Sequence, residues 1–264
     1  QDMPIESAED TIKRIFSTGD STVGAEITHE FNRYSRLQEV TFPKPARTRL
    51  IAVANQKGGV GKTTSTVNIA AALAKNGARV LVIDMDPQGN CSTALGVRHE
   101  SGEPSVYDVL EGRMSIAEVK RPCPDFETLD VVPASIDLSG AELEVAQFEN
   151  RNNLLNEAVQ QFLRESNEHF DYVFIDCPPS LGLLVINAMC AAREMLIPIQ
   201  AEYYALEGLG QLINTIGLVQ EHFNPILTVS TMMVTMFDKR TLLSREVYNE
   251  VKSHYPSIVL DTTI

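Results

Sequence analysis

An apolar segment runs directly into a glycine-rich loop in this chain. Leu50–Ala54 has the composition of a buried strand, and residues 57–64 read Lys-Gly-Gly-Val-Gly-Lys-Thr-Thr. The loop fits the phosphate-binding pattern G-x-x-x-x-G-K-[ST] except at its first glycine, where Gln56 or Lys57 stands, depending on the register. Thr63–Lys75 then places small apolar side chains at helical spacing. A strand, this loop and a helix in that order predict an α/β fold built around a phosphate site.

The loop has residue types that suit phosphate chemistry. Glycines allow backbone N–H groups to approach phosphate oxygens without a clash from Cβ, and the following helix adds its positive N-terminal end. Lys62 is expected to contact the β- and γ-phosphates, and the Thr63 hydroxyl to ligate Mg²⁺. The loop carries a second lysine, Lys57, where an ordinary phosphate loop needs one. We take this additional lysine as a clue to the mechanism.

Acidic residues end two further strand candidates. Asp84 and Asp86 close one, and Asp176 closes Tyr172–Asp176. A carboxylate at the carboxyl edge of a parallel strand points into the ligand crevice. One of Asp84 and Asp86 is expected to hold Mg²⁺ through water while the other orients the attacking water, although Asp84 alone also suits a capping role in a turn. Asp176 fits the second acidic element of phosphate-loop enzymes, which binds or supports Mg²⁺.

Short β-branched segments alternate with helical patterns over the rest of the chain. This alternation predicts a mostly parallel, twisted sheet with helices on both faces. The predicted strands are Leu50–Ala54, Arg79–Asp84, Thr128–Pro133, Tyr172–Asp176, Met195–Ile199 and Ile226–Met236. The predicted helices are Thr63–Lys75, Ser105–Glu111, Leu138–Phe148, Asn153–Ser166, Gly182–Ala192, Glu207–His222 and Leu243–His254.

The two ends of the chain differ from this pattern. Residues 1–49 show no strong periodicity and are interpreted as an N-terminal extension, with possible short helices at Glu6–Phe16 and Glu26–Leu37. Residues 50–264 form the predicted phosphate-loop domain. The chain stops soon after the apolar Ser257–Leu260, where an α/β sheet usually adds a covering helix. The domain is therefore expected to lack its C-terminal end.

Composition excludes several classes of protein. The chain has 264 residues, 44% of them hydrophobic, without an apolar run near the roughly 20 residues of a membrane helix. Its four cysteines, Cys91, Cys123, Cys177 and Cys190, show no CxxC spacing, so we expect a reduced cytoplasmic protein without disulfides or a zinc site. A net charge of −13 argues against an extended basic footprint, so any DNA binding would be regional and salt-sensitive.

Five segments together resemble one family. They are Lys57–Thr64, Asp84–Asn90, Asp176–Ser180, Gln200–Gly208 and Thr235–Thr241. In these segments the chain is similar to the ParA/Soj chromosome- and plasmid-partition ATPases, part of the deviant Walker A group of phosphate-loop proteins that also contains MinD. The resemblance covers about residues 50–264 and implies an ATPase that uses ATP and Mg²⁺.

The resemblance also assigns roles to residues. It implies that Lys57 crosses the interface of an ATP-sandwiched homodimer to the partner's nucleotide, while Lys62 serves the phosphates of its own chain, and that Gly58 lies at a crowded part of the interface. The implied catalytic residues are Lys57, Lys62 and Asp86. The implied nucleotide-binding residues are Lys57, Gly58, Gly59, Val60, Gly61, Lys62, Thr63, Thr64, Asp176 and Pro178, and the implied metal site comprises Thr63, Asp86 and Asp176.

The resemblance implies partners as well. Lys239 and Arg240 are similar to basic residues that bind DNA non-specifically once the dimer forms, although the alternative is a solvated pair of loop charges. A centromere-bound protein of the ParB type would stimulate hydrolysis. The implied location is cytoplasmic and nucleoid-associated, without a membrane partner. The family continues beyond the position of Ile264 with adenine contacts and further basic residues, which this sequence does not contain.

Other functions remain open at this stage. A MinD-like division regulator at the membrane surface would need a C-terminal amphipathic helix. A redox ATPase like the nitrogenase iron protein would need two cysteines at the dimer axis, and Cys91 and Cys177 fall within the nucleotide motifs instead. A simple metabolic ATPase would not need Lys57. Partition is the function that the motifs favour.

Overall fold

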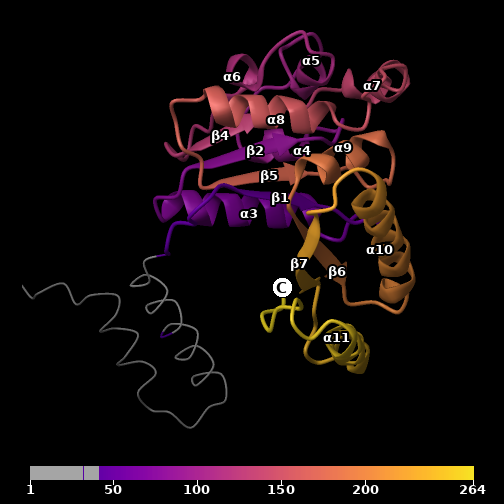
Figure 1. Cartoon of the computed structure of the whole chain (residues 1–264). Coiled ribbons are helices and arrows are strands. Elements are labelled where there is room, and N and C mark those ends of the chain that lie inside the picture. The colour runs from indigo at the N-terminus through magenta and orange to yellow at the C-terminus, as the bar shows by residue number, and fades with distance from the viewer. Residues whose placement is uncertain (1–31, 33–41) are drawn as a thin grey trace, which may run out of the picture. The chain divides into compact units, whose positions relative to one another are not determined.

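A parallel sheet forms the centre of the part of the chain that the structure describes (Figure 1). The computed structural model describes residue 32 and residues 42–264. In this part seven strands lie in the order β3-β4-β2-β5-β1-β6-β7, and all are parallel to their neighbours except β3, which is antiparallel to β4. The strands are β1 (Arg49–Val53), β2 (Val80–Asp84), β3 (Arg121–Pro122), β4 (Leu129–Val132), β5 (Tyr172–Asp176), β6 (Glu194–Gln200) and β7 (Thr228–Thr235).

Helices cover both faces of this sheet. Figure 1 shows α3 on one face and α8 and α9 on the other. The helices are α3 (Lys62–Lys75), α4 (Asn90–Ala94), α5 (Val106–Leu110), α6 (Ile116–Val119), α7 (Leu138–Val145), α8 (Leu154–Glu165), α9 (Leu183–Ala191), α10 (Ala205–His222) and α11 (Leu242–His254). This arrangement confirms the predicted α/β class.

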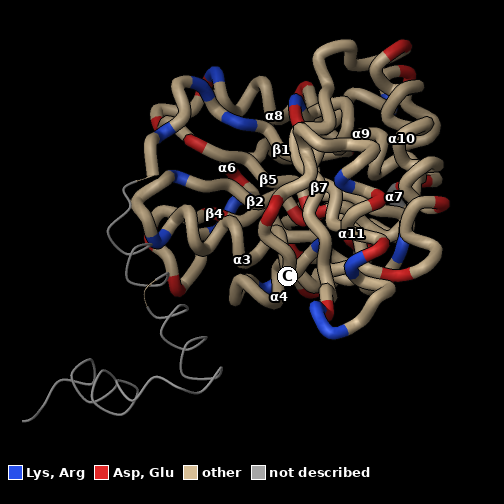
Figure 2. Tube along the Cα trace, turned by 90° about the horizontal axis from the view of Figure 1, so that it is seen from below, with Lys and Arg blue, Asp and Glu red and all other residues tan. Residues whose placement is uncertain are grey.

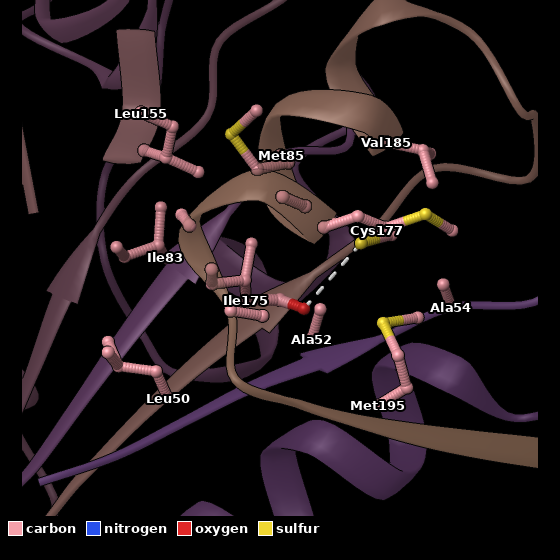
Figure 3. Close-up of a cluster of buried hydrophobic side chains, with 14 of the residues drawn as sticks. Leu50, Ala52, Ala54, Ile83, Met85, Leu155, Ile175, Cys177, Val185 and Met195 are labelled. Carbon is pink, nitrogen blue, oxygen red and sulfur yellow. Dashed lines mark hydrogen bonds between the residues drawn. The ribbon is translucent and has the colours of Figure 1, made fainter. Parts of the chain in front are cut away.

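The alternation of side chains along each strand explains why both faces need a cover. Leu50 and Ala52 of β1 belong to a core cluster that includes residues of α8, α9 and α10, while Ile51 and Val53 belong to a second cluster with residues of α3. Successive side chains of a strand point to opposite faces, so the four apolar residues that follow Arg49 in β1 need a cover on both faces of the sheet. Figure 3 shows the first cluster, where side chains from neighbouring strands meet those of α8 and α9.

Each predicted strand and helix of residues 50–264 is present, and the misses are short elements. α6 is a single turn that begins with a capping box between Ser115 and Glu118. A helix of four residues is too short to show a helical period, so only its capping residues could have indicated it. α4 and β3 are similarly short. The helices predicted at 6–16 and 26–37 lie outside the described residues, except for residue 32, and the boundary at residue 49 stays a prediction.

The apolar segment near residue 260 lies along the outer edge of β7. The backbone N–H of Leu260 donates to the Met232 carbonyl at 2.9 Å, and that of Ile264 donates to the Val234 carbonyl at 3.0 Å. Val259 forms a parallel bridge with Met232 and is buried. The main chain of these residues therefore satisfies part of the sheet edge that β7 would otherwise present to solvent.

Candidate functional site

The predicted site segments converge at the carboxyl ends of three adjacent strands. The phosphate-loop segment follows β1, the segment with Asp86 follows β2, and Asp176 ends β5, which lies between them. Their junction contains a hollow of about 630 Å³. It is lined by Gly58, Gly59, Gly61, Lys62, Thr63, Thr64, Val67, Asn68, Asp86, Gln88, Asn90, Ala94, Pro179 and Met236. Open parallel sheets bind ligands at such junctions.

The loop after β1 has the backbone that an anion site requires. Gly59 and Gly61 have φ angles of 75° and 89°, a region that costs an L side chain roughly 1–2 kcal/mol. A Cβ at Gly59 would meet no heavy atom within 4 Å, so the backbone, rather than crowding within this chain, accounts for glycine there. Gly61 precedes the first turn of α3, and Thr235 of β7 donates to the Val60 carbonyl at 2.8 Å, which ties the loop to the sheet.

The two lysines of the loop have different positions. Lys62 is buried and lines the hollow, with its Nζ donating to the Lys57 carbonyl at 2.9 Å. Burial lowers the pKa of Lys62, while the nearby Asp176 carboxylate opposes that shift. The half-exposed Lys57 does not line the hollow, and its ammonium forms an ion pair with Glu202, which follows β6. Of these two lysines, Lys62 lines the hollow and Lys57 does not.

Asp176 is hydrogen-bonded to two threonines in the first turns of α3. Its two carboxylate oxygens accept hydrogen bonds from Thr63 Oγ1 at 2.7 Å and Thr66 Oγ1 at 2.9 Å. The Thr63 hydroxyl uses its only proton in this bond, so its lone pairs remain available for a cation in the hollow. Asp176 is fully buried and lies outside the lining. The structure places it as a support for Thr63, and its predicted part in binding or supporting Mg²⁺ stays a prediction.

The two aspartates after β2 separate into different environments. Asp84 is fully buried and accepts hydrogen bonds from the Asp86 backbone N–H at 3.1 Å and from Ser92 N and Oγ at 2.8 and 2.7 Å. It thereby holds α4 against the end of β2. Asp86 lines the hollow, and its carboxylate accepts the Gln88 backbone N–H at 2.9 Å. Asp86 is the member of the pair that can reach a cation or a water there.

A magnesium site of the phosphate-loop kind fits these residues. Mg²⁺ usually takes one or two protein oxygens, several waters and phosphate oxygens, rather than a cage of side chains. Thr63 supplies a hydroxyl and Asp86 a carboxylate beside the same hollow. Within residues 42–264, no group of three or more His, Cys, Asp and Glu side chains is placed to hold a metal ion.

Asp84 and Asp176 form a buried acidic pair. They are register partners in the parallel ladder between β2 and β5. Burial raises the pKa of Asp84 to about 6, against the opposing effect of its bonds from Ser92. Burial, together with repulsion from Asp84, raises the pKa of Asp176 to about 7. The ionised pair is therefore a cost to the folded state at neutral pH.

This pair predicts an unusual pH dependence of stability without nucleotide. A carboxylate whose pKa is raised by folding binds its proton more tightly in the folded state, so its stabilising contribution is present at low pH and is lost as pH rises through the folded pKa. We expect the free energy of unfolding, from urea titrations, to increase by about 1–2 kcal/mol between pH 8 and pH 6. Asp176→Asn should flatten this increase. A free energy of unfolding of the wild type that decreases from pH 8 to pH 6 would contradict the expectation.

Some residues of the site differ from the prediction. Pro178 is buried and lies outside the lining, whereas Pro179 lines the hollow. Val60 is also buried, and its carbonyl contacts Thr235. Sequence reasoning missed further lining residues, namely Val67, Asn68, Gln88, Asn90, Ala94 and Met236. Most of them lie close in sequence to the predicted residues, but Met236 follows β7, and no sequence signal placed it beside the phosphate loop.

The two basic residues with a predicted DNA role lie in the turn before α11. Arg240 is exposed and forms a fork with Asp238, with Nε and Nη2 donating to the two carboxylate oxygens at 2.9 and 2.8 Å. This pairing lowers the pKa of Asp238 to about 2. Figure 2 shows Lys and Arg scattered among Asp and Glu over the described part of the chain.

The cysteines do not contribute to the lining of the site. Cys91, Cys123, Cys177 and Cys190 are free and buried, and Cys177 is enclosed among the side chains of Figure 3. Burial raises the pKa values of Cys91, Cys177 and Cys190. These thiols are unreactive core residues rather than groups presented for a cluster at a dimer axis.

Comparison with known proteins identifies the family. The family profile described as "AAA domain" matches residues 48–229. The sporulation initiation inhibitor protein Soj of Bacillus subtilis is 46% identical over 216 residues, which cover 82% of this chain and 83% of that protein. The chromosome partitioning protein ParA of Caulobacter vibrioides is 46% identical over 218 residues, which cover 82% of this chain and 80% of that protein. The chain belongs to the ParA/Soj family of chromosome-partitioning ATPases.

Solved structures agree with the fold of a ParA/Soj ATPase. A cobyrinic acid a,c-diamide synthase from Mycobacterium smegmatis, with bound ATP analog and magnesium, has a TM-score of 0.75 and 40% identity and is covered over 86% of its chain by 82% of this one. A putative plasmid partition protein of Borrelia burgdorferi bound to AMPPNP has a TM-score of 0.66 and 26% identity, with 78% of this chain and 81% of that chain covered.

No helix in residues 42–264 of this chain has the length and apolarity to cross a bilayer.

Proposed function

We propose that this ParA/Soj chain binds ATP and Mg²⁺ in the hollow after β1 and hydrolyses ATP as one half of a homodimer. The observation that carries this proposal is the separation of the two loop lysines. Lys62 lines the hollow of its own chain, while Lys57 lies outside it and is paired with Glu202. A half-exposed lysine beside a phosphate site, but not in it, is suitably placed to reach a nucleotide held by a second subunit.

Binding within one subunit uses the loop, α3 and Asp86. The N–H groups of the loop and the start of α3 attract the phosphates, and Lys62 adds a charge once its Nζ leaves the Lys57 carbonyl. Bound Mg²⁺ would neutralise phosphate charge, with Thr63 and Asp86 as the residues that hold it. The ATP analog and magnesium bound in the M. smegmatis structure support ATP and Mg²⁺ as the molecules bound here.

Hydrolysis requires a water in line with the bond between the terminal phosphorus and its bridging oxygen. Asp86 is the carboxylate of the lining, so we assign it the orientation of this water and the acceptance of its proton. Lys57 of the other subunit would offset the negative charge that develops on the phosphate oxygens, as an arginine finger does. A chain without its dimer partner lacks that charge, so intrinsic turnover should be slow.

Dimerisation also supplies the DNA-binding surface in this proposal. A phosphate can replace Asp238 as the planar, two-point partner of Arg240, since guanidinium groups pair with carboxylates and phosphates in the same way. Lys239 adds a second cation to the same turn. Two copies of this turn would bind the DNA backbone without reading bases, and ParB-type stimulation of hydrolysis would release it. Such a protein is expected in the cytoplasm on the nucleoid.

Arg240→Ala tests the proposed DNA contact. We expect weaker binding of the ATP-loaded dimer to duplexes of any sequence, with the slope of log K against log salt reduced by about 0.9 for each phosphate that the variant no longer neutralises. Fluorescence anisotropy over a salt series measures both quantities. Arg98→Ala is the matched control, because Arg98 is also an exposed arginine paired with carboxylates. Equal weakening by both variants would exclude a specific role of Arg240.

Co-sedimentation separates partition from the MinD-like alternative. The full chain is sedimented with plasmid DNA or with anionic liposomes, each with and without ATP and Mg²⁺. We expect ATP-dependent retention on DNA and none on liposomes. Retention on liposomes alone would replace the partition function by a membrane-surface function.

A further inference from the structure

A second hollow, here named the α8 groove, lies between α5, α6 and α8. Its volume is about 960 Å³, and its lining residues include none of those around the nucleotide site. Figure 1 shows α5 and α6 beside α8, in the helical layer opposite α3. The groove is therefore separate from the chemistry proposed above.

One row of apolar side chains lies along the groove. Leu154, Ala158 and Phe162 of α8 line it at a spacing of four residues, so they share one face of the helix. At 1.5 Å per residue the row is about 12 Å long, or roughly two helical turns. Leu154 and Ala158 pack against the core on one side and remain partly exposed on the other. Met114 and Phe148 extend this partly exposed apolar surface.

Carboxylates flank the apolar row. Glu157 and Glu165 lie on α8 in the adjacent row, and Glu118 of α6 contributes to the same lining. In the described part of the chain, their hydrogen-bond partners are neutral: Asn150 for Glu157, Gln161 for Glu165 and Ser115 for Glu118. Within that part, three negative charges beside the groove thus lack a cation.

The cations of the lining are already paired. Arg113 forms ion pairs with Glu111 and with Asp108, the latter at 3.1 Å. Lys120 lies 2.7 Å from Asp130 and 3.6 Å from Glu168. Neither cation is placed against the three carboxylates described above. The groove consequently offers an apolar row with an uncompensated acidic border.

We propose that the α8 groove is a docking site for a cationic amphipathic helix of a partner protein. An apolar face repeating every three to four residues fits along the partly exposed Leu154 and Ala158, in the helix-in-groove manner. Phe162 continues the row but is itself buried. Lysine or arginine side chains beside that face would meet Glu118, Glu157 and Glu165. The acidic border gives a cationic helix an advantage over an acidic one by the same charge complementarity that selects partners at other interfaces.

A model peptide tests the docking site. The probe is a fluorescein-labelled amphipathic helix of leucine and lysine, titrated against the full chain and followed by anisotropy. The groove variant combines Glu118→Gln, Glu157→Gln and Glu165→Gln. The control variant combines Glu221→Gln, Glu246→Gln and Glu250→Gln, which are exposed carboxylates on α10 and α11, away from the groove. Both variants remove three of the same charges, so their net charge is equal.

We expect the groove variant to bind the leucine–lysine peptide about tenfold more weakly than wild type, and the control variant to bind it within about threefold of wild type. Both variants should retain ATP binding, which shows that they fold. Hydrogen exchange of residues 154–165 should slow when the peptide binds to the wild type. A helix of leucine and glutamate should not bind. Equal weakening in both variants, no weakening in either, or unchanged exchange in α8 would overturn the proposal.

Discussion

Lys62→Ala should abolish ATP binding by this chain under ordinary assay conditions. Lys62 is the buried lysine of the lining, and its Nζ is held by the Lys57 carbonyl and is ready to move to a phosphate. Loss of a desolvated, hydrogen-bonded charge from an interface costs about 2–5 kcal/mol, so the affinity should fall by at least about 30-fold. Isothermal titration calorimetry with ATP and Mg²⁺ measures the effect.

Loss of ATP binding in the Lys62 variant can be distinguished from loss of folding. Burial lowers the pKa of Lys62, so its charge is not a stabilising feature of the nucleotide-free fold, and the variant should unfold near the wild-type temperature. Lys75→Ala is the matched control, because Lys75 lies on the same helix but is exposed at its far end. Normal ATP affinity in the Lys62 variant would refute the assignment of the loop.

Lys57→Ala should have the opposite profile, with monomer binding of ATP retained and ATP-dependent dimerisation lost. Lys57 lies outside the lining of its own hollow, so the affinity of one subunit should stay within about threefold of wild type. The dimer would instead hold two nucleotides at its interface with less positive charge, and a phosphate without its cation there is strongly unfavourable. Light scattering with ATP and Mg²⁺ should then show monomer where wild type is dimeric.

Glu202→Gln distinguishes the reach of Lys57 from the structure of its loop. This change removes the carboxylate that pairs with Lys57 but keeps the lysine and the shape of its neighbour. We expect the variant to dimerise at least as well as wild type. If it loses dimerisation as Lys57→Ala does, then the ion pair within one chain, rather than a contact across the interface, is what matters. Unchanged dimerisation by Lys57→Ala itself would also exclude the role of Lys57 in trans.

The sequence was sufficient to predict elements whose signal is local. β-branched runs predicted β2 and β5, because such strands are buried on both faces and carry apolar side chains up to their terminal aspartate. The same reasoning failed for α4 and α6, because five and four residues are too few to show a repeating helical pattern. Pro179 lines the hollow while its neighbour Pro178 is buried outside the lining, and the nucleotide contact of Pro178 stays a prediction.

Charge roles were the least predictable part of the site. Asp84 and Asp86 are two residues apart, and their spacing alone left their roles exchangeable; only the family resemblance selected Asp86. In the structure Asp84 is fully buried against Ser92, which makes it a support, and Asp86 lines the hollow. The difference arises because Ser92 of α4 donates two hydrogen bonds to Asp84 and none to Asp86.

The sequence alone determined the chemistry of the loop, because glycines, a lysine and a threonine at fixed spacing suffice to form an anion site at the start of a helix. The tertiary structure decided which distant residues complete it. Strand β5 lies between β1 and β2, so Asp176 supports Thr63 across 113 positions of the chain. The tertiary structure also pairs Lys57 with Glu202, in the loop after β6, so that Lys57 does not line the hollow of its own chain. The order of the strands depends on the packing of the whole sheet, so local sequence patterns do not indicate it.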